Sequence, residues 1–443
     1  MTPHGHDEKS EGAIMLTCQR TRLTALLAGL TAVLLLVACG SAGEDRGAPG
    51  SDVLVAQGVS RQVPTDAPVE QTVAGLTAFG HDLYMVAADP AKNTVISPLS
   101  IGYAFGMARA GAGGQTASQL DQVFGFPAVG PHAAFNDLDR QIVTAGGPSP
   151  LPSSAPTPAP DALPAAPVVA IANGLFIQDG LPVTDGFLRI LAAQYGAGAQ
   201  IFPSGKGAEQ INAWVREQTA ERIDRLFDQL DPATRLVIAN AVYLKADWQA
   251  PFAKIPTTDA TFTRADGTTV AVPMMRQQES LRYADGQGWQ AVELPYAASE
   301  LAMRVIVPQE ARPPAELLSP ETLAQVDSGL RPEQVDLFLP RWDFGTDLDL
   351  LPAVQKLGLT DVDDFSGISP GGFGLDQAVH RANITVDEWG TEAAAVTGLA
   401  FPTSAPPPPQ FVVRADRPFA FAIVHKPTGA PLFLGSVADP LAG

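Results

Sequence analysis

Apolar residues recur at helical spacing in two separate parts of the chain. Val69, Val73, Leu76 and Leu83 lie three to seven positions apart on one face, which predicts an amphipathic helix over residues 69–89. A similar pattern from Ile211 to Phe227 predicts a second helix. Between them, residues 147–167 hold eight prolines in 21 positions. Because proline donates no backbone hydrogen bond, this stretch is predicted to be an exposed loop or insertion.

Strand patterns dominate the later part of the chain. Residues 236–244 are apolar almost throughout, with Asn240 the strongly polar exception, which is typical of a strand buried on both faces. Residues 418–424 and 431–437 flank a turn at 426–429 and predict a hairpin. Helices first and strands later indicate an α+β fold with large, mostly antiparallel sheets.

The first forty residues have the pattern of an export signal. Arg20 and Arg22 precede an apolar run over 23–38, which is shorter than the roughly 20 residues that span a bilayer. Residues 36–39 (LVAC) are similar to a bacterial lipobox, in which Cys39 would carry the lipid. We therefore expect an extension and signal over 1–38, with Met15 as an alternative start, and a flexible linker over 39–65. The predicted location is extracytoplasmic, as a cell-envelope lipoprotein or a secreted protein, and a plain cleaved signal or a short anchor helix are the alternatives.

Composition and charge exclude several classes of protein. The chain of 443 residues is 46% hydrophobic, which is too apolar for a disordered acidic protein. Its net charge of −19 disfavours nucleic-acid binding, which needs clustered Lys and Arg, and also a polyanionic activator. Two cysteines cannot form a disulfide framework.

The usual catalytic motifs do not occur in the sequence. It contains no GxSxG, HExxH, Walker or CxxC motif, and no histidines at metal-ligand spacing in the mature chain. A triad can be drawn from Ser97, His380 and an aspartate, but no nucleophile elbow marks it. We therefore expect no enzymatic activity, no metal and no cofactor.

Residues 388–404 (EWGTEAAAVTGLAFPTS) are small and weakly polar. In an extended chain, alternate side chains share a face, and one face would carry only small or apolar residues: Thr391, Ala393, Ala395, Thr397 and Leu399. The charge of Glu392 falls on the other face, and Gly390 permits a hinge. The segment reads as an Ala-rich helix, a linker, or a strand able to slide between two existing strands.

The stretch HRANITVDEWGTEAAAVTG (380–398) closely resembles the reactive-loop hinge of the serpins. Similar matches occur at 93–120, 238–252, 292–296 and 417–435, so the resemblance extends over 66–443. It implies a serpin domain with three β-sheets, eight to nine helices and an exposed reactive-centre loop at 388–410. In inhibitory serpins a serine protease cleaves this loop. The loop then inserts into the main sheet and carries the acyl-bound protease with it.

The resemblance also implies roles for individual residues. Ser97, Ser100, Asn240 and His380 match the shutter, a polar cluster under the main sheet. A buried Asn or His costs about 1–3 kcal/mol unless it is hydrogen-bonded, so mutual hydrogen bonds are expected. Trp248 matches the breach, where insertion begins, with ordinary core packing as the alternative. The hinge comprises Glu388, Gly390, Thr391, Ala393, Ala395 and Thr397, and Glu388 is either paired with a nearby Lys or Arg or solvated.

Counting forward from the hinge places the reactive bond at Ser404–Ala405, with Phe401 and Leu399 as alternatives. A small Ser404 favours an elastase-like or subtilisin-like serine protease as partner, whereas Phe401 would suit a chymotrypsin-like one. Trp389 departs from the family pattern, because it is bulky at the hinge base. Two functions stay open: a monomeric, lipid-tethered protease inhibitor, and a non-inhibitory serpin-fold binding or adhesion lipoprotein. The small residues on the inserting face favour inhibition.

Overall fold

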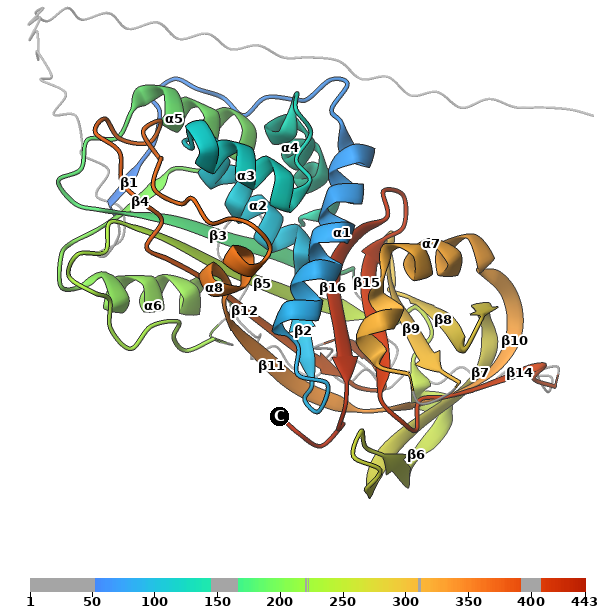
Figure 1. Ribbon diagram of the computed structural model, residues 1–443. Coiled ribbons are helices and arrows are strands. Elements are labelled where there is room, and N and C mark those ends of the chain that lie inside the picture. Colours follow the sequence, from blue (N-terminus) through green and yellow to red (C-terminus); the bar gives the residue numbers. More distant parts are fainter. Residues whose placement is uncertain (1–51, 145–165, 220, 222, 310–311, 392–407) are drawn as a thin grey trace, which may run out of the picture. The chain divides into compact units, whose positions relative to one another are not determined.

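The computed structural model describes residues 52–443, apart from 145–165, 220, 222, 310–311 and 392–407 (Figure 1). Two large sheets carry the fold, with α1 to α5 on one side of β3 and β5 and α6 on the other (Figure 1). The α-helices in the described part are α1 (Val69–Ala87), α2 (Pro98–Arg109), α3 (Gly114–Phe124), α4 (Pro131–Ile142), α5 (Asp185–Ile190), α6 (Gly207–Gln218), α7 (Pro320–Gly329) and α8 (Leu350–Lys356). Short 3₁₀ segments at Phe252–Lys254 and Pro314–Leu318 and a π-helix at Leu191–Tyr195 accompany them.

The main sheet has seven strands in the described residues. Their order is β1 (Asp52–Leu54), β4 (Ala199–Phe202), β3 (Val168–Gln178), β5 (Leu236–Asp247), β13 (Gly390–Thr391), β12 (Gln377–Val386) and β11 (Trp342–Asp349). Strands β5 and β12 also pair directly and in parallel over Gln377–Ala382. The strand predicted at 236–244 is β5, and its residues through Leu244 are buried on both faces, as expected.

The second sheet has nine strands. They run β14 (Phe411–Arg414), β10 (Arg331–Pro340), β7 (Thr269–Gly286), β8 (Trp289–Pro295), β9 (Leu301–Pro308), β15 (Phe419–His425), β16 (Ala430–Val437) and β2 (Thr94–Ile96), with β6 (Ile255–Thr263) on β7. The predicted hairpin is β15–β16. The described strands thus form two hydrogen-bonded sheets and not three. The reason is that β7 is 18 residues long and pairs with β6, β8 and β10, which joins the two smaller sheets.

The predicted helix at 69–89 is α1, but the second predicted helix is shorter than its pattern. Helix α6 ends at Gln218, and Glu221 then adopts a φ of 62°, which an α-helix cannot contain. Ile223 and Phe227 lie beyond this point, yet both are buried under the main sheet. The apolar spacing therefore predicted correctly which residues are buried, but it predicted too long a helix.

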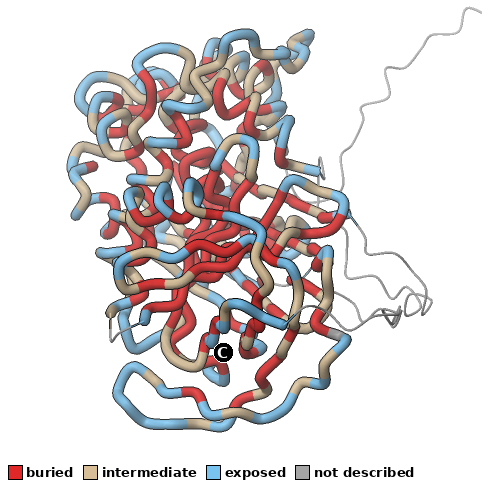
Figure 2. Tube along the Cα trace, turned by 90° about the vertical axis from the view of Figure 1, so that its right-hand side faces the viewer, coloured by how far each residue is buried: buried red, intermediate tan, exposed pale blue. Residues whose placement is uncertain are grey.

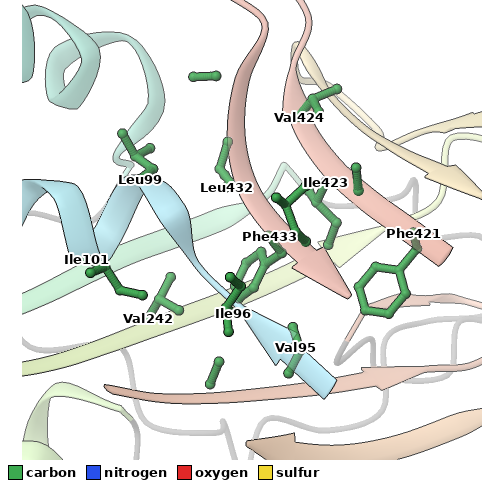
Figure 3. Close-up of a cluster of buried hydrophobic side chains, with 14 of the residues drawn as sticks. Val95, Ile96, Leu99, Ile101, Val242, Phe421, Ile423, Val424, Leu432 and Phe433 are labelled. Atoms are coloured by element: carbon green, nitrogen blue, oxygen red, sulfur yellow. The ribbon is translucent and has the colours of Figure 1, made fainter. Parts of the chain in front are cut away.

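Buried residues follow the two sheets and the inner faces of the helices (Figure 2). The close-up in Figure 3 shows how elements distant in sequence share one apolar cluster. Leu99 and Ile101 of α2 and Val242 of β5 lie there with Phe433 of β16 (Figure 3). This core fixes α2 against both sheets and so fixes the position of the helix start that carries Ser97.

Residues 52–54 and 61–62, inside the stretch 39–65 that was predicted to be a flexible linker, contact the domain. Asp52–Leu54 pairs antiparallel with β4 at the edge of the main sheet. Arg61 forms an ion pair of 2.5 Å with Asp139 and donates from Nε to Asn136 Oδ1 at 3.0 Å. An exposed sheet edge offers backbone partners to any strand-competent segment, and local composition does not report this. Residues 1–51, including Cys39, and most of the 147–167 insertion lie outside the described residues.

Candidate functional site: the loop hinge in the main sheet

Strand β13 enters the main sheet at one end of the β5–β12 pair. Gly390 lies opposite Asp247 and Thr391 opposite Ala246 on β5, while Thr391 also pairs with Val386 on β12. A Cβ atom at Gly390 would overlap the carbonyl oxygen of Ala246 and lie 2.8 Å from Asp247 Cα. Only glycine therefore fits at this position, and the hinge already occupies the first two positions of an added central strand.

The side chain of Thr391 is held by an aromatic pair. Thr391 is 2% exposed, and its hydroxyl lies 2.7 Å from the hydroxyl of Tyr296. The Tyr296 ring stacks on Trp248 with centroids 4.6 Å apart. Burial raises the pKa of the Tyr296 phenol well above its usual range, so the hydroxyl stays protonated. The predicted breach residue Trp248 thus lies directly beneath the hinge.

Backbone hydrogen bonds connect Trp248 to the residues before the hinge. Its indole Nε1–H donates to the carbonyl of Asp387 at 3.0 Å, and its backbone N–H donates to the carbonyl of Trp389 at 2.7 Å. The carboxylate of Asp387 accepts the backbone N–H groups of Trp389 and Gly390 at 2.8 and 3.2 Å. Burial raises the pKa of Asp387, and these two hydrogen bonds oppose that rise.

Glu388 is paired, which is the first of the two alternatives considered for it. It forms an ion pair with Arg341 and accepts a hydrogen bond from Thr257. Burial opposes its ionisation, but the hydrogen bonds from Arg341 and Thr257 outweigh burial and lower its pKa. The Glu388 carboxylate therefore ties the base of the loop to the residue that follows β10.

The four predicted shutter residues lie together in the interior, at 0–1% exposure. His380 on β12 faces Asn240 on β5 across the parallel pair, with Nδ1 to Oδ1 at 2.5 Å. Its Nε2 accepts the backbone N–H of Ser97 at 3.1 Å, and Asn240 Nδ2 donates to Ser100 Oγ at 2.5 Å. Asn240 also donates to Asn173 of β3. The cluster therefore links three strands of the main sheet to the start of α2.

The polar cluster contains no nucleophile–base arrangement. His380 contacts the backbone nitrogen of Ser97, whereas the Ser97 hydroxyl accepts the N–H of Ser100 at 3.3 Å and caps α2. Burial lowers the pKa of His380 from 6.5 to about 3, so the ring is neutral. With Nε2 accepting, Nδ1–H donates to Asn240. These contacts hold strands together and carry no catalysis.

Three participants were missed by sequence reasoning. Asn173 sits alone among apolar residues in β3, which is the same signal that marked Asn240. Asp387 lies three residues before Gly390, a spacing at which an Asp side chain often accepts backbone N–H groups of a turn. This spacing could have identified Asp387 from the sequence. No sequence feature distinguishes Tyr296 from an ordinary core tyrosine. Ala393, Ala395, Thr397, Leu399, Phe401, Ser404 and Ala405 lie outside the described residues.

Comparisons with known proteins agree with this geometry. The Serpin (serine protease inhibitor) family model matches residues 74–440. An uncharacterised serpin-like protein of Thermococcus kodakarensis is 33% identical over 383 residues, covering 84% of this chain and 86% of its own. The leukocyte elastase inhibitor of Bos taurus is 32% identical over 397 residues, covering 84% of this chain and all of its own.

Solved structures show the same fold. The native state of the thermophilic serpin tengpin superposes with a TM-score of 0.76 at 24% identity, covering 88% of this chain and all of tengpin. Thyroxine-binding globulin in complex with thyroxine gives a TM-score of 0.70 at 25% identity, covering 84% of this chain and 99% of its own. The predicted α+β serpin fold is confirmed, and the predicted absence of enzymatic activity agrees with the match. The chain belongs to the serpin family of serine protease inhibitors and is not an enzyme.

Proposed function

We propose that this protein inhibits serine proteases as a suicide substrate, by inserting its cleaved reactive loop between β5 and β12. The observation that carries the proposal is the position of β13. Gly390 and Thr391 already pair with β5, and the chain that follows alternates small residues on the face of Thr391. Below β13, the β5–β12 pair is held by its own backbone pairing and by the His380–Asn240 contact, and both can separate without breaking a covalent bond.

The energetics of the site fit such a mechanism. Direct pairing of β5 and β12 spans only part of their lengths, so an added strand gains backbone hydrogen bonds on both of its edges. Opening the pair breaks the His380–Asn240 contact, which raises a barrier while the loop is intact. The native protein would then be trapped above a more stable inserted state, and inhibition requires insertion to be faster than deacylation.

Ser404–Ala405 is the proposed reactive bond, with Phe401 and Leu399 as alternatives. A small residue before the bond suits the shallow pocket of an elastase-like or subtilisin-like protease. The name of the bovine relative, leukocyte elastase inhibitor, supports this class of target.

A denaturing gel tests the function directly. The mature protein is incubated with elastase-like, subtilisin-like and chymotrypsin-like proteases, and we expect a covalent complex that survives boiling. Thr391→Arg should yield cleaved protein without complex, because its charge would have to stay in the buried sheet position that Thr391 occupies. Thr258→Arg, on the exposed part of β6, is the matched control and should leave complex formation intact. Plain turnover of the wild-type loop by every enzyme would refute inhibition.

Tethering to the cell envelope through Cys39 is part of the proposal. Among the described residues, no helix is long and apolar enough to cross a membrane. Thirteen positions separate Cys39 from Asp52, where β1 begins, so a lipid on Cys39 would hold the domain close to a bilayer. Cys39→Ser should move the protein from the membrane fraction to the soluble fraction, and retention in membranes would refute the lipid anchor.

A further inference from the structure

An arginine–phenylalanine–arginine stack crosses three neighbouring strands of the second sheet, and one of them, β14, follows the reactive loop. Phe338 of β10 has Arg276 of β7 and Arg414 of β14 at matched positions on its two sides. The guanidinium carbon lies 3.6 Å from the ring centroid in Arg414 and 5.0 Å in Arg276. Val412, 47% exposed, shares the face of Arg414 two residues earlier. We refer to Arg276, Phe338, Val412 and Arg414 as the Arg414 platform.

The two guanidinium groups of the platform differ in their charge balance. Arg276 forms two hydrogen bonds with Asp336, at 2.8 and 2.9 Å, and is thereby neutralised. Arg414 is exposed and has no hydrogen-bond acceptor and no carboxylate partner among the described residues. A guanidinium has five N–H donors in a planar fork that fits a carboxylate bidentately. Phe338 therefore orients a fork whose donors are left for a partner.

The platform lies within reach of any protease that attacks the loop. Val412 is seven positions beyond Ala405, so the chain can separate them by at most about 25 Å. A protease domain of about 250 residues has a radius of gyration near 18 Å, hence a diameter of about 45 Å. A protease bound at Ser404–Ala405 is therefore large enough to reach the sheet edge formed by β14.

The acidic charge of the rest of the molecule makes an unpaired arginine near the reactive loop important for protease association. With a net charge of −19, the chain repels acidic proteins at long range. The unpaired guanidinium of Arg414 adds a local positive charge to this acidic molecule, on the strand that follows the reactive loop. Charges at the rim of an interface act mainly on the association rate and on the choice of partner, and less on the final affinity.

We propose that the Arg414 platform is a secondary docking site for a target protease that carries a carboxylate beside its substrate cleft. Arg414 binds that carboxylate, and Val412 supplies an adjoining apolar contact. The site would select among proteases with similar cleft specificity. This inference rests on the proposed function, since the docked partner is the protease that cleaves the loop.

The test compares two arginines of the same sheet. Arg414→Ala removes the free guanidinium, Arg414→Glu reverses its charge, and Arg414→Lys keeps the charge without the fork. Arg331→Ala is the matched control, because Arg331 also lies over an aromatic ring, that of Tyr283 at 5.6 Å, but is paired with Asp285 and Glu333. Circular dichroism and thermal melting verify that each variant is folded.

Reversible binding is measured with proteases whose catalytic serine is replaced by alanine. The association rate and the yield of covalent complex are measured with the active enzymes. The panel contains elastase-like and subtilisin-like enzymes, some with an acidic residue beside the cleft and some without. For the acidic ones we expect Arg414→Ala to slow association several-fold and Arg414→Glu at least tenfold, more at low salt than at high salt. Arg414→Lys should fall between wild type and Ala, and Arg331→Ala should match wild type.

The possible results separate this inference from the proposed function. If the acidic proteases bind all Arg414 variants within twofold of wild type, the docking site is refuted, even when covalent inhibition is intact. If binding depends on Arg414 but no covalent complex forms with any active enzyme, the docking site stands and suicide inhibition fails. A failure of every inactivated protease to bind the wild-type protein counts against the docking site.

Discussion

The imidazole of His380 on β12 contacts the side-chain amide of Asn240 on β5, and this contact crosses the one strand pair that an inserted loop must separate. Both side chains are fully buried, at 0% exposure. Strand β13 enters the same pair at its other end, through Gly390 and Thr391. The main sheet is therefore opened at one end by two residues of the loop and held closed below them by a neutral polar contact.

Asn240→Ala tests the closing contact. The change leaves the Nδ1–H of His380 buried without an acceptor, so we expect a loss of about 2–3 kcal/mol in stability. With a lower barrier to opening, the intact loop should also insert spontaneously during mild heating, and inhibitory activity should disappear faster than in wild type. The readouts are the thermal midpoint and the residual complex formation after incubation. Asn383→Ala, at an exposed position of β12, the strand that carries His380, is the control and should change neither.

The buried histidine makes stability depend on pH in a defined direction. The pKa of His380 is about 3 in the folded protein, against 6.5 ordinarily, because burial penalises the charged ring. Below pH 6.5 the unfolded chain binds a proton that the folded chain does not, so stability falls as the pH falls from 6.5 toward 3. The contribution is about 1.4 kcal/mol per pH unit, or about 2 kcal/mol at pH 5.

His132 adds a loss of the same sign, since burial lowers its pKa to about 4. Thermal midpoints at pH 7 and pH 5 measure the combined effect. NMR titration of the ring protons assigns it to individual residues. A His380 ring that protonates near pH 6.5 in the folded protein would contradict the assignment of a neutral, buried imidazole.

Tyr296→Phe isolates the hydrogen bond that holds the hinge in the sheet. The aromatic stack on Trp248 is kept, but the buried hydroxyl of Thr391 loses its partner. We expect β13 to leave the sheet more often, at a cost of about 1 kcal/mol in stability. Limited proteolysis of residues 388–410 should become faster, and Trp248 fluorescence should change. Tyr283→Phe is the control, because Tyr283 lies on the second sheet and its hydroxyl accepts a hydrogen bond from Gln290. If both variants change proteolysis equally, the effect does not come from the hinge.

Cleavage of the loop should make the protein more heat resistant. If residues 391–399 become a central strand after the cut, the nicked protein gains backbone hydrogen bonds to β5 and β12, and its thermal midpoint should rise by tens of degrees. Thr397→Arg offers a matched control, because it places a charge on the inserting face beyond the described part of the hinge. The nicked variant should show little or no rise. An unchanged midpoint in nicked wild type would mean that the fold stores no strain for inhibition.

The interior strands and the hairpin could be predicted because their signals are local. The continuous apolar run at 236–244 favours a buried strand, and β5 is that strand. The helix expected at 211–227 was predicted too long, because the pattern of apolar residues indicates burial and not backbone conformation. Its apolar residues are buried, but the backbone turns at Glu221, and burial alone does not set the backbone conformation.

The sequence by itself determined the family, the main elements and the polar cluster, since each is encoded within a short segment or a motif. Tertiary structure alone decided that the hinge begins inside the sheet, that Glu388 meets Arg341, that residues 52–54 and 61–62 contact the domain and that Arg414 stacks on Phe338. The members of each contact are tens to more than a hundred positions apart. The packing of the two sheets sets the distances between these residues. Side-chain periodicity along one segment carries no information about that packing.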